Sequence, residues 1–150
     1  MVYKRIVDYH NNINRLVKNE CKTICTIVRK NVHKRKIKDS DYPGCVVVCK
    51  IRNHSLCCVE NSHIRYNYSQ VRSINNKLLD CGQIGVDKVN NNIIGACAEP
   101  NAAFSLLKDM GRFHQALHTL CFSMVLRPRT KQIEPSCPIC THVFPQLIIQ

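Results

Sequence analysis

The stretch Cys97-Ala98-Glu99-Pro100 decides the fold, together with Pro135-Ser136-Cys137-Pro138-Ile139-Cys140 further along the chain. Proline is tolerated in the first turn of a helix, where its missing N–H has no partner to lose. Pro100 and Pro138 therefore predict two helices, one beginning at residues 97–99 and one capped by Cys137. Between them, the nearly unbroken apolar run Leu120–Leu126 predicts a strand that is covered on both faces.

Three cysteines at these helix starts form a candidate metal site. We expect Cys97, Cys137 and Cys140 to bind Zn²⁺ as thiolates, because the positive end of a helix dipole favours an anion. Three protein ligands leave a tetrahedral zinc ion with one open position, where water is acidified. Glu99 follows Cys97 by two residues, and its carboxylate is the candidate proton carrier for that water.

Outward from these motifs, the sequence predicts three further segments. Residues 2 to about 30 lack Gly and Pro, and their apolar residues recur at helical spacing, which indicates a basic amphipathic helix. Cys45–Ile51 and a second segment within Leu56–Tyr68 are typical of a β-hairpin. The Asn-rich residues 69–92 are expected to form a long irregular connection.

The order Cys-x-Glu, buried strand and Pro-x-Cys-x-x-Cys resembles the zinc-dependent cytidine deaminase-like superfamily, over about residues 93–144. One departure is Ser136, which separates Pro135 from Cys137 where the family has Pro directly before Cys. The resemblance implies that Cys97, Cys137 and Cys140 bind zinc and that Glu99 shuttles protons. It also implies that water adds to C4 of a cytosine, or less readily to C6 of an adenine, and ammonia leaves.

The resulting fold expectation is an α/β three-layer sandwich of the deaminase type. We expect a small mixed sheet, made of the hairpin and a central strand, with helices on both faces. Its C-terminal part is expected to be truncated, because the chain ends ten residues after Cys140. Residues 1–40 are expected to form the basic helix packed on a zinc domain of residues 41–150.

Charge is concentrated at the N-terminus. The formal net charge is +12, and residues 1–40 hold 11 Lys or Arg against 3 Asp or Glu. This basic segment predicts a polyanionic partner, so the expected substrate is cytosine in single-stranded DNA or RNA, with Tyr66 and Tyr68 as candidates for base stacking. A free nucleoside such as cytidine is the alternative substrate.

A structural zinc module that binds nucleic acid without catalysis is a second alternative. In that case a fourth ligand would close the site, and the candidates in the sequence are Cys121, His114, His118 and His142. Thiol–disulfide exchange at Cys137 and Cys140 is a third, weaker alternative.

The cysteine count bears on the compartment. Eleven cysteines cannot all pair, and their spacing lacks the density of a small secreted scaffold, so we expect a reducing, intracellular compartment. The N-terminal residues lack the apolar core of a secretory signal, and no apolar run approaches the roughly 20 residues of a membrane span.

Overall fold

A four-stranded sheet forms the middle of the molecule. The computed structural model describes residues 1–64 and 66–149. The sheet has the order β1-β3-β2-β6, with β1 at Lys4–Asp8, β2 at Val46–Ile51, β3 at Leu56–Asn61 and β6 at Leu120–Phe122. β2 and β3 form the expected hairpin, and Cys49 lies opposite Cys58 in its register.

The sheet is antiparallel at each of its three pairings, so the expectation of a mixed sheet is wrong. β6 pairs with β2 through Cys49 and Phe122, and it runs in the opposite direction. An apolar run reports that a strand is covered on both faces, but it carries no information about direction. The strand is also shorter than the run Leu120–Leu126, and a single bridge joins Leu126 to Val46.

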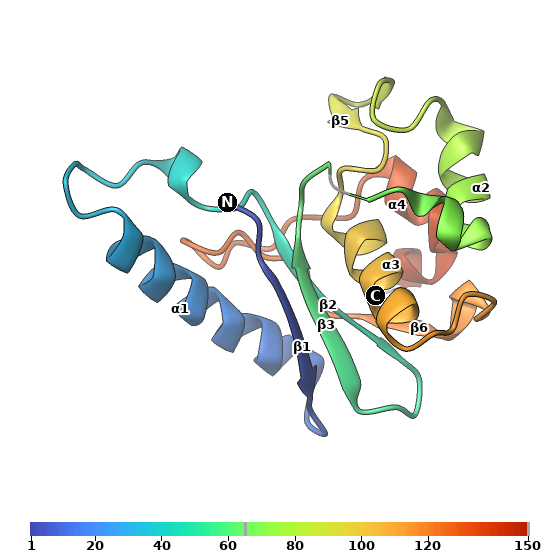
Figure 1. Ribbon diagram of the computed structural model, residues 1–150, viewed down its shortest axis with the longest axis horizontal. Helices are drawn as coiled ribbons and strands as arrows, with labels where there is room; N and C mark the ends of the chain where they lie inside the picture. Colours follow the sequence, from blue (N-terminus) through green and yellow to red (C-terminus); the bar gives the residue numbers. More distant parts are fainter. Residues whose placement is uncertain (65, 150) are drawn as a thin grey trace.

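Helices cover both faces of the sheet, which confirms the layered α/β architecture (Figure 1). Successive residues of a strand point to opposite faces. Val46 and Val48 therefore pack against α1 at Ile13–Asn31, whereas Val47 and Cys49 pack on the side of α3 at Ala98–Asp109.

The N-terminal segment differs from the expected helix over residues 2–30. Lys4–Asp8 is an edge strand paired with β3, and the helix begins only at Ile13, where the Asn12 side chain caps it. Helical spacing holds for α1, whose buried side chains lie on one face. The spacing of Ile6 and Tyr9 fits a helix too, and pairing with the sheet overrides it. Residues 1–40 thus supply β1, which is an edge strand of the sheet, and α1, which packs on the sheet.

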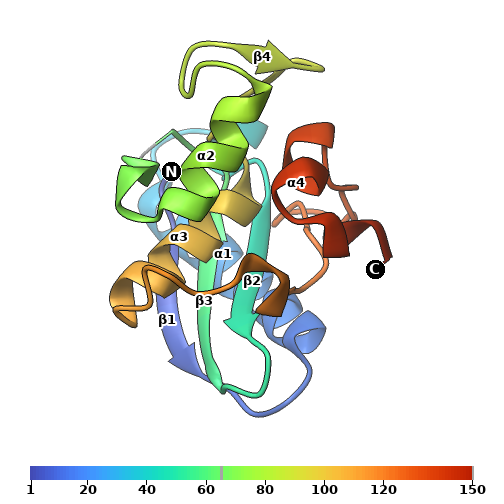
Figure 2. The ribbon, with the colours of Figure 1, turned by 90° about the vertical axis from the view of Figure 1, so that its right-hand side faces the viewer.

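The expected irregular connection over residues 69–92 is also wrong. It contains α2 at Arg72–Cys81 and a short hairpin of β4 at Lys88–Val89 and β5 at Asn92–Ile93 (Figure 2). α2 is stabilised by Ile74 and Leu78, which lie one turn apart and are fully buried. The Asn-rich composition conceals this two-residue apolar stripe.

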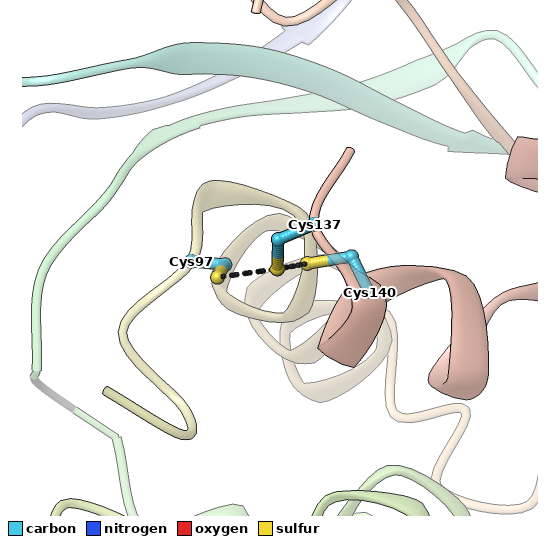
Figure 3. Close-up of side chains that lie close together, drawn as sticks. All are labelled: Cys97, Cys137 and Cys140. Carbon is cyan, nitrogen blue, oxygen red and sulfur yellow. Dashed lines mark hydrogen bonds between the residues drawn. The ribbon is translucent and has the colours of Figure 1, made fainter. Parts of the chain in front are cut away.

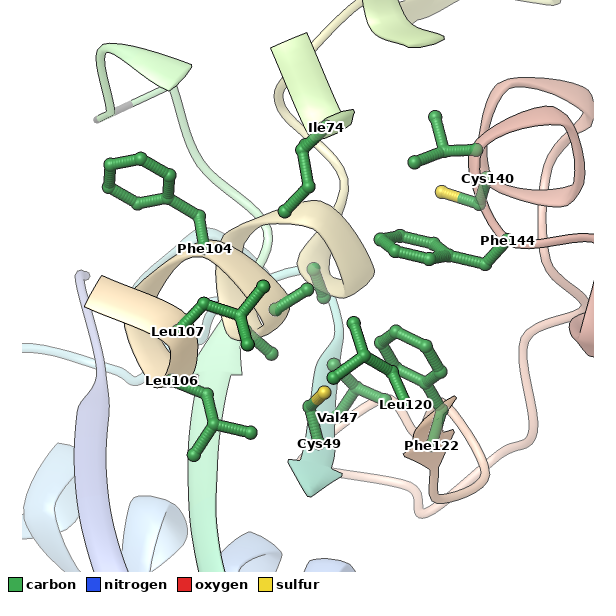
Figure 4. Packing of buried hydrophobic residues seen from close by; sticks show 14 of the residues in the cluster. Val47, Cys49, Ile74, Phe104, Leu106, Leu107, Leu120, Phe122, Cys140 and Phe144 are labelled. Carbon is green, nitrogen blue, oxygen red and sulfur yellow. The ribbon is translucent and has the colours of Figure 1, made fainter. Parts of the chain in front are cut away.

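The remaining elements are short. They are α4 at Pro138–Val143 and the 3₁₀ helices η1 at Asp39–Asp41, η2 at Tyr68–Gln70, η3 at Leu117–Thr119 and η4 at Pro145–Ile149. α3, α2, α4 and the sheet enclose the larger hydrophobic core, which includes Phe104, Phe122 and Phe144 (Figure 4). Within the described residues, each helix is too short or too polar to cross a bilayer.

Candidate metal centre

Three cysteine thiols meet where α3 and α4 begin (Figure 3). Cys97 is the N-cap of α3, Cys137 is the N-cap of α4, and Cys140 lies in the first turn of α4. Cys137 Sγ lies 3.4 Å from Cys97 Sγ and 3.6 Å from Cys140 Sγ. The structure therefore brings together the three residues that the sequence predicted as ligands.

Cys97 and Cys137 are 40 positions apart in the sequence, and both cap the start of a helix. This position favours the thiolate form of a cysteine, which is the form that binds a metal. Cys97 and Cys137 both have the extended backbone of an N-cap, and Pro138 occupies the first helical position after Cys137. Free N–H groups at a helix start favour a thiolate. Hydrogen bonding with Cys140 and Cys97, together with the N–H groups of Ile139 and Cys140, holds the pKa of Cys137 far below its usual value. The same thiol contacts raise the pKa of Cys97 and of Cys140.

The spacing of the three sulfur atoms fits a tetrahedral metal ion. A Zn–S bond of about 2.3 Å places two sulfur ligands roughly 3.8 Å apart in tetrahedral geometry. The two shorter Sγ–Sγ distances are 3.4 and 3.6 Å, and all three sulfur atoms lie within 4.8 Å of one another. These three thiols could hold a metal ion without large movement of either helix.

The candidates for a fourth ligand lie elsewhere. Among the described residues, the group contains only these three cysteines. His142 contacts Asp80 at 3.0 Å, and His114 and His118 are exposed on the segment after α3. Cys121 lies in β6 opposite Lys50 of β2. The geometry therefore does not support a closed four-ligand site built from these residues.

Glu99 lies beside the cluster, in the first turn of α3. Its residue exposure is 4%, and it lines the same cavity as Cys97 and Cys137. Burial raises the pKa of the Glu99 carboxyl above its ordinary value, while hydrogen bonding with Ser136 opposes that shift. A carboxylate that is buried and close to a metal position is suited to exchanging protons with water there.

A cavity of about 500 Å³ opens beside Cys97 and Cys137. Such a volume lies within the range of roughly 300–1,000 Å³ that is usual for small-molecule sites. Besides the residues around the cysteine cluster, Cys45 and Val125 contribute to its wall, and three segments contribute two or more residues each. They are the segment after β3 (Ser62, His63, Ile64), the β4–β5 hairpin (Asn91, Asn92, Ile93) and the segment before α4 (Glu134, Pro135).

Neither the known protein families, nor the curated proteins, nor the solved structures contain a match to this chain. The functional argument therefore rests on the residues and geometry of the site.

Several cavity residues were missed by sequence reasoning. His63, Asn91 and Asn92 line the cavity, but the sequence places them in a presumed strand and a presumed irregular connection. The sequence signal for the β4–β5 hairpin was the adjacent pair Asn90 and Asn91. Asparagine tolerates a positive φ, which both residues adopt in the tight turn. No comparable signal marks His63.

The two tyrosines proposed for base stacking serve the core instead. Tyr68 is 2% exposed, and its hydroxyl donates to the carbonyl oxygen of Gly95 at 2.7 Å. Tyr66 packs against Phe104 with ring centroids 4.9 Å apart, and its hydroxyl contacts Glu60. Both tyrosine side chains thus pack with the larger hydrophobic core.

Proposed function

We propose that this chain is a zinc-dependent hydrolytic deaminase that converts the cytosine base of a nucleoside to uracil. Cys97, Cys137 and Cys140 are the proposed zinc ligands, and Glu99 is the proposed proton carrier. The observation that carries the proposal is the meeting of three thiols, without a fourth ligand among the described residues, beside a cavity that a buried carboxylate also lines.

The zinc ion supplies Lewis acidity, which makes a water molecule nucleophilic near neutral pH. Glu99 accepts a proton from that water and delivers it to the base as the amino group departs. The balance is one cytosine and one water giving one uracil and one ammonia. Cavity walls exclude bulk water from Glu99, whose burial favours proton transfer to the substrate over loss to solvent.

The position of the basic segment favours a nucleoside over a polymer. α1 packs on the face of the sheet opposite α3, so its cations lie on the other side of the sheet from the metal centre (Figure 1). The basic segment consequently gives no support for presenting a nucleic acid to this cavity, whose volume suits one nucleoside.

The test combines metal analysis with a uridine assay. The purified protein is expected to contain one equivalent of zinc and to convert cytidine to uridine. Glu99→Gln should retain zinc and lose at least about 100-fold in kcat, because general acid–base catalysis contributes that much. Cys137→Ser should lose both zinc and activity. Asp8→Asn, which changes an exposed carboxylate of β1, is the matched control and should retain both. A protein that binds no zinc, or a fully active Glu99→Gln variant, would refute the proposal.

A second candidate function is binding of single-stranded DNA or RNA, and one observation favours it. Arg15, Lys18, Lys22 and Arg29 are exposed on one side of α1 over about 21 Å, and the only acidic residue of that helix, Glu20, is buried. Such a stripe matches the repeated charge of a phosphate backbone. Binding of a fluorescent oligodeoxycytidine should weaken with salt, and Lys18→Gln with Lys22→Gln should reduce that salt dependence. Conversion of deoxycytidine to deoxyuridine within the oligonucleotide, with release of ammonia, would make the polymer a substrate.

A further inference from the structure

His63 carries an unpaired polar atom in the wall of the cavity. Its side chain is 10% exposed, and it lines the cavity together with Cys97 and Glu99. Nδ1 of His63 is buried and has no hydrogen-bond partner among the described residues. Buried polar atoms are nearly always paired, so this nitrogen calls for an explanation.

Glu60 determines which hydrogen bond that nitrogen can make. Nε2 of His63 lies 3.0 Å from Oε2 of Glu60, a fully buried carboxylate at the end of β3. The hydroxyl groups of Tyr66 and Ser105 donate to the other carboxylate oxygen. Because Glu60 acts as the acceptor in these contacts, we assign the ring proton of His63 to Nε2. Nδ1 of a neutral ring is then an acceptor that lacks a donor.

The imidazole is held in place before any ligand arrives. Asn101 of α3 donates hydrogen bonds to the main-chain carbonyl oxygens of His63 at 2.9 Å and Asn61 at 3.0 Å. The ring of Tyr66 packs against the imidazole at a centroid distance of 5.7 Å. A side chain fixed at both its backbone and its far nitrogen loses little freedom on binding, as a preorganised binding group should.

The chemistry of a cytosine nucleoside limits which of its groups could donate a hydrogen bond to Nδ1 of His63. Its only hydrogen-bond donors are the 4-amino group and the sugar hydroxyls, because N1 carries the sugar. The amino group must face the metal centre and Glu99, which lie where α3 and α4 begin. His63 lies in the chain that follows β3, on another wall of the cavity.

We propose that Nδ1 of His63 accepts a hydrogen bond from a sugar hydroxyl of the bound nucleoside. His63 is then a substrate-binding residue that reads the sugar, while the metal centre and Glu99 act on the base. The inference rests on the proposed deaminase function for the identity of the ligand, but its test below does not depend on turnover.

The experiment compares cytidine with its 2′-deoxy, 3′-deoxy and 5′-deoxy analogues on wild type, His63→Leu and His63→Gln. His63→Leu is expected to raise the KM for cytidine about five- to tenfold, the worth of one hydrogen bond, with kcat changed less than about twofold. For one of the deoxy analogues, the KM on the wild type should exceed the KM for cytidine by the same factor. His63→Leu should not raise the KM for that analogue further. His63→Gln should restore most of the affinity, because its amide offers a donor to Glu60 and an acceptor to the ligand. If His63→Leu raises the KM equally for all four compounds, or for none of them, the inference is overturned.

Binding measurements separate this inference from the proposed function. The same compounds are titrated calorimetrically into Glu99→Gln, alone and combined with His63→Leu. Binding that depends on His63 and one hydroxyl supports the inference even if the wild type deaminates nothing, in which case only the proposed function fails. Deamination without any His63 dependence keeps the function and refutes the inference. If no compound binds, both are refuted.

Two further readouts exclude a purely structural role for His63. The zinc content of both His63 variants should match that of the wild type. The unfolding midpoint of His63→Gln, which keeps a donor for Glu60, should also match that of the wild type. In Glu99→Gln protein labelled with ¹⁵N-histidine, cytidine should shift the Nδ1 resonance of His63, and the analogue lacking the contacted hydroxyl should not. An unchanged Nδ1 resonance with saturating cytidine would contradict the proposed hydrogen bond.

Discussion

Asn101 donates a hydrogen bond from its side-chain amide to the main-chain carbonyl oxygen of His63, at 2.9 Å. This contact joins the first turn of α3, which begins at the metal centre, to the segment that forms another wall of the cavity. Its carboxamide oxygen also accepts a hydrogen bond from Tyr68 at 2.5 Å. One buried side chain therefore links the wall of the cavity that carries the cysteine cluster to the wall that carries His63.

Replacing Asn101 with alanine should destabilise the fold. The substitution leaves the carbonyl groups of Asn61 and His63 without the side-chain donor of Asn101, which is fully buried. The hydroxyl of Tyr68 loses one of its two acceptors and keeps the carbonyl oxygen of Gly95. Each unsatisfied buried group costs about 1–3 kcal/mol, although water and relaxation offset part of the sum, so we expect a loss of about 3 kcal/mol. Urea denaturation followed by circular dichroism measures this loss.

Asn19→Ala is the matched control for Asn101→Ala. Asn19 is an exposed asparagine inside α1, and its substitution should change the free energy of unfolding by less than about 0.5 kcal/mol. Equal stability of the two variants would show that Asn101 does not brace the cavity.

The cluster of Cys97, Cys137 and Cys140 could be predicted from sequence because the signals for the two helix starts are local. A proline in the first turn marks each helix start, Pro100 in α3 and Pro138 in α4. Cys97 and Cys137 are therefore placed at helix starts without knowledge of the tertiary fold. The Asn101–His63 contact spans 38 residues and has no local signature. Its prediction requires the strand pairing that brings the end of β3 to the start of α3.

The errors in the fold have the same origin. β1 has five residues and fits both a helical and a strand pattern, and only pairing with β3 decides between them. α2 depends on packing of Ile74 and Leu78 against the core, while its other positions are polar. By contrast α1, α3 and the β2–β3 hairpin have long or strongly patterned sequences, which explains their successful prediction.

Removing the metal should both unfold the site and abolish any activity. A ligand that binds only the folded state stabilises it by about 2.7 kcal/mol at 100 times its Kd. A strong chelator is therefore expected to lower the unfolding midpoint of the wild type and to leave Cys97→Ser unchanged, because that variant has already lost a ligand. Differential scanning fluorimetry with and without added zinc measures both effects.

Cys121→Ser is the control for the loss of a thiol as such. Cys121 is partly exposed in β6 and lies outside the cluster of Cys97, Cys137 and Cys140. The variant should respond to the chelator like the wild type. A chelator effect that survives Cys97→Ser would place the metal elsewhere.

The stability of the fold should fall at alkaline pH, partly through Cys21. Burial raises the pKa of the Cys21 thiol to about 11, above the value of about 8.5 for an exposed thiol. A raised folded-state pKa gives stability that is fully present below the unfolded-state pKa and is lost as the pH rises towards the folded-state pKa. Between about pH 8 and pH 10, the wild type should thus lose about 1.8 kcal/mol through this thiol alone.

Comparison of Cys21→Ala with the wild type isolates that contribution. The destabilisation caused by Cys21→Ala should shrink between about pH 8 and pH 10, because the variant has no thiol to ionise. Leu16→Ala removes apolar volume from the same buried face of α1, and its destabilisation should be independent of pH. Parallel pH profiles for the two variants would contradict the assignment to Cys21.

Gly95 precedes the metal ligand Cys97 by two residues, and its conformation leaves no room for a side chain. Its φ is +90°, and a Cβ there would lie 2.9 Å from Cγ2 of Ile84 and 3.1 Å from Cε2 of Tyr68. The positive φ and the crowding each cost about 1 kcal/mol or more, so Gly95→Ala should destabilise the fold by about 2–3 kcal/mol.

Gly111→Ala separates these two costs. Gly111 also has a positive φ, +66°, but a Cβ there meets no atom within 4 Å, so only the backbone cost of about 1 kcal/mol is expected. Since Gly111 lies at the far end of α3, its variant should retain zinc and activity, whereas Gly95→Ala should lose zinc affinity as the chain before Cys97 shifts. Urea denaturation and zinc titration of both variants measure this difference, and equal behaviour would show that the packing of Gly95 against Ile84 and Tyr68 does not position the first ligand.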